Sequence, residues 1–90
     1  MEQTSLAIDC QRIKHFLELN QLVQASGLVT RVESMLGAKI AHDSPQAMEK
    51  HPLWLAYRAT FRVKSRILSG LTKDALTDTE ILLNEIAKGK

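Results

Sequence analysis

Apolar residues recur every three or four positions along most of this chain, and this spacing constrains its fold more than any other feature. A period of 3.6 gathers such residues on one side of an α-helix, whereas a half-buried strand alternates with a period of two. No usable stretch alternates in that way. Two stripes that differ in phase predict helices over residues 5–19 and 22–40, with a break near Asn20. The stripe residues are Leu6, Cys10, Ile13 and Leu17, then Leu22, Ala25, Val29, Val32, Leu36 and Ile40.

A third helix is predicted to begin at Pro52 and to end at Ser69, before Gly70, because proline suits the first turn of a helix and glycine follows its end. Its apolar side carries three of the chain's four aromatic residues, so we expect it to be the central helix. We expect these rings to be largely buried, with a cost of roughly 3–5 kcal/mol for Phe61→Ala. Lys64 is expected to extend its ammonium group past the core. The three rings are Trp54, Tyr57 and Phe61.

A last, shorter helix is expected from Thr77 to Gly89, because Thr77 and Glu80 have the spacing of an N-terminal capping box. Residues 70–77 then form a polar linker. No internal repeat is found. The chain has 44% hydrophobic and 24% charged residues. This composition is that of a folded chain. We therefore predict a small all-α bundle of three to four helices that forms a single domain over residues 1–90.

Features typical of a membrane-bound or secreted protein are not found in the sequence. The longest apolar runs have three or four residues, far fewer than the ~20 that span a bilayer. Cys10 is the single cysteine, so no intrachain disulfide forms, and the first twenty residues do not resemble a secretory signal. We expect a cytoplasmic protein that does not contact a membrane.

Residue types that perform catalysis or bind metal do not form a recognisable pattern. The spacing of His42, Asp43 and His51 matches no zinc site. Cys10 and His15 lie five residues apart. That separation is about 140° around a helix, so they do not pair as nucleophile and base. No glycine-rich phosphate loop is present. We therefore predict no enzyme activity, no cofactor and no metal.

Charge is strongly segregated along the chain. Residues 50–73 carry six basic residues and no acidic residue, whereas the segments before and after each have a net charge of −2. Three of the basic residues are four positions apart and form one line on the third helix: Arg58, Arg62 and Arg66. Like charges at this spacing repel by a few tenths of a kcal/mol per pair. Either acidic side chains of the flanking segments neutralise this line, or the line binds an anionic partner.

The absence of catalytic motifs leaves binding as the leading interpretation. We predict a protein-binding module, such as an adaptor, inhibitor, immunity protein or antitoxin, whose partner presents an acidic surface. If the arginines serve binding alone, changing all three to glutamine should leave thermal stability equal or slightly higher. The predicted partner-binding residues are Lys50, Leu55, Arg58, Arg62 and Arg66.

Two alternatives remain open from the sequence. A nucleic-acid-binding regulator would use the same arginines on phosphates, although the aromatic rings project to the opposite side and no recognition helix follows the last helix. A structural subunit would pair with a second copy as a homodimer, through the helix side left over by Leu55, Ala59 and Ile81.

Overall fold

Four α-helices form the fold in this computed structural model, which describes residues 2–89, with side chains from Ser5 onward. No strand occurs within those residues. The predicted all-α bundle is therefore confirmed. The helices are α1 (Glu2–Glu18), α2 (Leu22–Asp43), α3 (Trp54–Leu68) and α4 (Thr72–Lys88), and a short 3-10 turn, η1 (Met48–Lys50), precedes α3.

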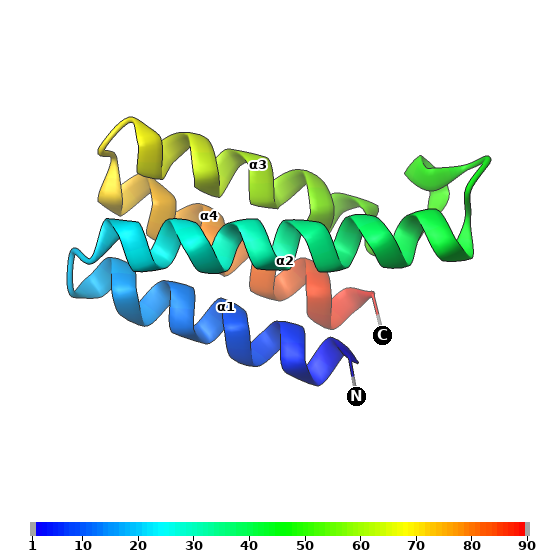
Figure 1. Ribbon diagram of the computed structural model, residues 1–90, viewed down its shortest axis with the longest axis horizontal. Coiled ribbons are helices and arrows are strands. Elements are labelled where there is room, and N and C mark those ends of the chain that lie inside the picture. The colour runs from blue at the N-terminus through cyan, green and yellow to red at the C-terminus, as the bar shows by residue number, and fades with distance from the viewer. Residues whose placement is uncertain (1, 90) are drawn as a thin grey trace.

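The helices run alternately up and down, and each packs against two neighbours. Figure 1 shows α2 in front, with α1 and α3 on either side of it and α4 behind. The packed pairs are α1 with α2, α2 with α3, α3 with α4, and α4 with α1. Both short links lie at one end of the bundle, and the chain ends at the other (Figure 1). None of the four helices in residues 2–89 combines the length and apolar character needed to cross a bilayer.

The two short links share one backbone conformation. Asn20 has a φ of 57° and Gly70 a φ of 73°. Both values lie in the left-handed region that commonly ends a helix. Each residue is followed by one of nearly equal geometry, Gln21 at φ −94°, ψ 76° and Leu71 at φ −90°, ψ 73°. The residues of each matching pair lie 50 positions apart.

Burial repeats with the same offset of 50, so the bundle consists of two similar helical hairpins. The sequence hides this structural repeat because only three residues are identical at that offset, in the pairs Arg12 and Arg62, Lys14 and Lys64, and Ala25 and Ala75. Buried positions match far better than residue types do. The matching buried sets are Leu6, Cys10, Ile13, Leu17, Ala25, Val29, Val32 and Leu36, and Ala56, Thr60, Val63, Ile67, Ala75, Thr79, Leu82 and Ile86.

The apolar stripes of the first two helices face the core, as predicted, except that Leu22 is only half-buried. Cys10 is completely buried in this core. Burial, together with the negative charge of the adjacent Asp9, raises the pKa of the Cys10 thiol from 9.0 to about 12. The thiol therefore stays protonated and unreactive at neutral pH.

The start of the last helix was predicted wrongly. α4 begins at Thr72, so the link after α3 has only three residues and the expected capping box does not exist. The Thr77 hydroxyl instead donates a hydrogen bond to the carbonyl oxygen of Lys73 within the helix, at 3.2 Å. Ala75 is fully buried, and this packing extends the helix through residues that looked like a polar linker.

The aromatic residues of α3 are less buried than expected, and the prediction is wrong for Phe61, which is 46% exposed. Small side chains of α3 face the core instead, among them Ala56 and Ala59. Trp54 and Tyr57 are half-buried. Tyr57 packs over Gly37 of α2, where an added Cβ would lie 3.1 Å from the tyrosine ring. Phe61→Ala should therefore cost less than the removal of a fully buried ring.

Candidate partner-binding surface

Two of the three aligned arginines bind an acidic residue of the neighbouring helix. The Nε atoms of Arg62 and Arg66 lie 3.9 and 3.4 Å from the two carboxylate oxygens of Asp78 in α4. Asp78 is only 9% exposed. The flanking acidic segment therefore neutralises much of this line.

Arg58 differs from the other two arginines. It is exposed and has no ion pair or side-chain hydrogen bond with the described residues. Leu55, one turn earlier on α3, is 58% exposed. We call the surface formed by Leu55, Arg58, Arg62 and Arg66 the basic side of α3, and it borders α4.

The structure contains a second cluster of one aspartate and two arginines, which was not predicted from the sequence. Asp9 of α1 is 4% exposed, and its carboxylate lies 3.3 Å from Arg31 of α2 and 3.9 Å from Arg12. The three-residue spacing of Asp9 and Arg12 was the one available signal. Each hairpin thus holds a buried aspartate between two arginines.

Two lysines link the hairpins to each other. Lys14 of α1 lies 3.4 Å from Glu80 of α4, and Lys64 of α3 lies 3.9 Å from Glu33 of α2. Lys64 extends past the core as predicted, and it ends at this carboxylate. The two lysines occupy equivalent positions in the structural repeat.

His42, Asp43 and His51 come together at the corner between α2 and α3. The Asp43 carboxylate accepts hydrogen bonds from His51 Nε2 at 3.1 Å and His42 Nδ1 at 3.2 Å, and Lys39 Nζ lies 3.3 Å away. The backbone N–H of Leu53 donates to His51 Nδ1 at 3.0 Å. Both ring nitrogens of His51 are therefore occupied, which leaves neither to move a proton or to bind a metal.

The chemistry of this corner is structural. Hydrogen bonds from His51, then from His42 and Lys39, hold the pKa of Asp43 well below its ordinary value. No group of three or more histidine, cysteine and acidic side chains suited to a metal occurs in the described part of the chain. The corner joins the end of α2 to the start of α3.

Asp43→Asn should lower the melting temperature at pH 7, because the neutral amide loses the charge-assisted bonds. A lowered pKa in the folded state gives stability that is present above the unfolded value of about 3.9 and is lost as pH falls below it. The difference in melting temperature between the two proteins should therefore shrink in acid, while the control Glu49→Gln should match the parent throughout. A deficit that stays constant down to about pH 3 would contradict the assignment.

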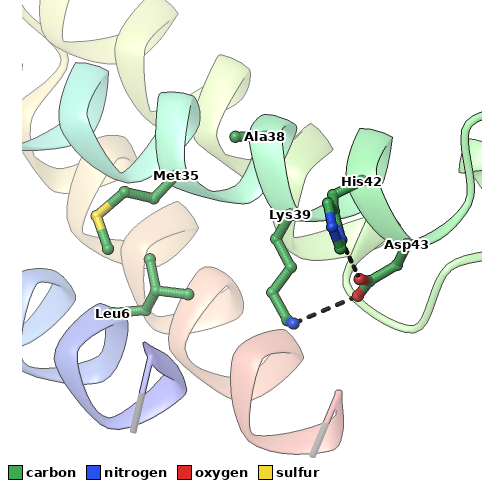
Figure 2. Close-up of a pocket in the computed structure, with 6 residues that line it drawn as sticks. All are labelled: Leu6, Met35, Ala38, Lys39, His42 and Asp43. Atoms are coloured by element: carbon green, nitrogen blue, oxygen red, sulfur yellow. Dashed lines mark hydrogen bonds and ion pairs between the residues drawn. The ribbon is translucent and has the colours of Figure 1, made fainter.

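A pocket opens beside this corner, between α1 and the second half of α2 (Figure 2). Lys39 and Asp43 pair with each other in its wall, and His42 bonds to the same carboxylate. These groups thus satisfy one another. The lining residues are Leu6, Met35, Ala38, Lys39, His42 and Asp43.

The five predicted partner-binding residues lie along α3 and the preceding 3-10 turn, but they differ in their freedom to bind. Arg62 and Arg66 share Asp78. Lys50, Leu55 and Arg58 are exposed, and the two cations form no ion pair with the described residues.

Comparisons of the chain with protein-family models, with curated proteins and with solved structures found no match.

Proposed function

We propose that this chain is a protein-binding module that engages an acidic surface of its partner through the basic side of α3. The observation that carries the proposal is Arg58, an exposed guanidinium without an intrachain partner among the described residues, beside the exposed side chain of Leu55. A cation that pairs a partner's carboxylate, next to an apolar anchor, is a common composition for the centre of an interface. Roles as adaptor, inhibitor, immunity protein or antitoxin all act through such contacts.

Binding of nucleic acid through the same arginines has weaker support. Arg62 and Arg66 would have to leave Asp78, which is nearly buried, and a buried carboxylate without partners is costly. The negative charge of Asp78 also repels phosphates. Phe61 is exposed one turn after Arg58, but it is the one exposed aromatic ring of α3, whereas proteins that bind single strands stack successive bases on several rings.

Self-association through Leu55, Ala59 and Ile81 does not fit the packing. Such an interface needs Ala59 at the surface, whereas Ala59 is completely buried on the core side of α3. Of these three residues, only Leu55 and Ile81 are exposed.

Capture experiments test the proposal. The immobilised protein is exposed to lysate of the cells that produce it, with and without nuclease, at low and moderate salt. We expect a captured protein that survives nuclease, that is lost with Arg58→Glu or Leu55→Asp, and that is weakened by salt. The control Lys73→Glu makes the same charge change at an exposed site remote from Leu55.

Two outcomes would contradict the proposal. Capture that disappears with nuclease would indicate nucleic acid, whose binding also falls log-linearly with salt at a slope of about −0.9 per neutralised phosphate of duplex DNA. Capture that is indifferent to Arg58 and Leu55 would place the contact on another surface.

A further inference from the structure

One line of side chains on α3 points away from the core along the whole helix. The buried side chains of α3 are Ala56, Ala59, Thr60, Val63 and Ile67. At 100° per residue, the opposite side of the helix carries a different set. We call this set the outer ridge of α3, and its residues are Trp54, Arg58, Phe61, Ser65 and Leu68.

The outer ridge has the spacing of a coiled-coil seam. Its residues follow one another in steps of four, three, four and three, as the a and d positions of a heptad do. Large apolar side chains stand seven residues apart, at Trp54, Phe61 and Leu68, and polar Arg58 and Ser65 alternate with them. Leu68 is 76% exposed and Phe61 is 46% exposed. Within the bundle α3 packs against α2 and α4, and neither of these helices covers the seam.

The aromatic rings beside this seam are held in place by the bundle. The ring of Phe61 meets that of Tyr57 edge-on, with 5.0 Å between their centroids, and the Trp54 ring lies 5.6 Å from Tyr57. Tyr57 in turn packs over Gly37 of α2. Side chains that are fixed before binding lose little freedom on binding. Aromatic rings and arginine are also the groups that most often dominate binding energy at an interface.

Charge determines which helix can pack on the outer ridge. Arg62 and Lys64 lie beside the seam and are paired with acidic residues of α4 and α2. Arg58 lies in the seam itself and has no such pair among residues 2–89. Residues 50–73 contain no acid, so the α3 of a second copy would bring no carboxylate to Arg58. An acidic helix would supply one.

We propose that the outer ridge of α3 binds an acidic amphipathic α-helix of the partner protein. Its apolar side meets Trp54, Phe61 and Leu68, and one of its carboxylates pairs with Arg58. The inference rests on the proposed function, because both use Arg58, and it adds the form of the partner. To cover the ridge, the partner helix needs about four turns, with apolar residues every three or four positions and acidic residues beside them.

Selection from a displayed peptide library tests this form of the partner. Each peptide has about three heptads, long enough to become helical on a surface. Its a and d positions vary among leucine, isoleucine, valine and alanine, and its e and g positions among glutamate, glutamine and lysine. We expect glutamate to be enriched at e and g on the parent protein. On Arg58→Glu, lysine should be enriched in its place.

The fluorescence of Trp54, the single tryptophan of the chain, then measures binding of an enriched peptide. The peptide has no tryptophan and covers this half-buried ring, so the emission should shift to shorter wavelength. Phe61→Ala and Leu68→Ala should each weaken binding about tenfold or more. The matched control is Ile8→Ala, which removes a side chain that is 55% exposed on α1 and should bind as the parent does. Circular dichroism of each variant confirms that it is folded.

Three results would overturn the docked helix and leave the acidic partner in place. The first is equal binding of a peptide with the same composition in shuffled order, which would show recognition of charge alone. The second is a selection that enriches no peptide, or binding that is indifferent to Phe61 and Leu68. The third is a parent protein that sediments as a dimer at about 100 µM while Leu68→Ala is monomeric, which would assign the ridge to a second copy. Enrichment of lysine as often as glutamate on the parent would contradict the proposed function as well.

Discussion

Leu36→Ala is expected to lower the free energy of unfolding by about 2–5 kcal/mol, a large part of the stability of a domain of this size. Leu36 is completely buried in α2, at the position equivalent to the buried Ile86 of the second hairpin. Its truncation removes apolar contacts and leaves a cavity that the rest of the bundle fills only in part. Chemical denaturation followed by circular dichroism measures this loss.

A matched substitution on the surface serves as the control. Leu19 lies in the link after α1 and is 54% exposed. Leu19→Ala should therefore change the free energy of unfolding by less than about 0.5 kcal/mol. Equal losses for the two variants would show that Leu36 does not lie in a packed core. For the same reason, Phe61→Ala should cost less than the roughly 3–5 kcal/mol of a fully buried ring, since Phe61 is 46% exposed.

Helix periodicity predicted the first hairpin well because its stripes are apolar and continuous. All four stripe residues of α1 are buried, and so are five of the six in α2. The buried positions of the second hairpin were harder to predict, since they hold small or polar residues such as Thr60, Ala75 and Thr79. Such residues become core only through the approach of neighbouring helices, which local sequence does not specify.

The width of an apolar arc also does not tell which part of it faces the core. On α3 the apolar residues cover a wide part of the helix surface, and the aromatic rings among them were expected to face the core. The helices approach each other over Ala56 and Ala59 instead, which moves Phe61 to the flank. The sequence left undecided for a similar reason whether the arginines of the candidate surface form ion pairs within the chain. Asp78 reaches Arg62 and Arg66 only once α4 packs beside α3.

The combined change Arg62→Gln and Arg66→Gln should lower the free energy of unfolding by about 1–3 kcal/mol, since it leaves the nearly buried Asp78 carboxylate without charged partners. At about 4–8 °C per kcal/mol for a domain of this size, the melting temperature should fall by several degrees. This result is opposite to the one expected from the sequence if the arginines served binding alone, and it agrees with the alternative in which acidic side chains of the flanking segments neutralise the line. Arg58→Gln is the control and should leave stability equal or slightly higher, because it removes repulsion and breaks no ion pair.

Adding Asp78→Asn to the double variant separates the ion pairs from other effects of the two arginines. The asparagine carries no charge, so it should recover part of the lost stability, and the coupling energy from the complete cycle measures the interaction. If the double variant melts with the parent and binding is lost, Arg62 and Arg66 act in partner recognition and their contact with Asp78 contributes little. If stability falls while binding changes only with Arg58, the line divides into two arginines that hold α3 to α4 and one that meets the partner.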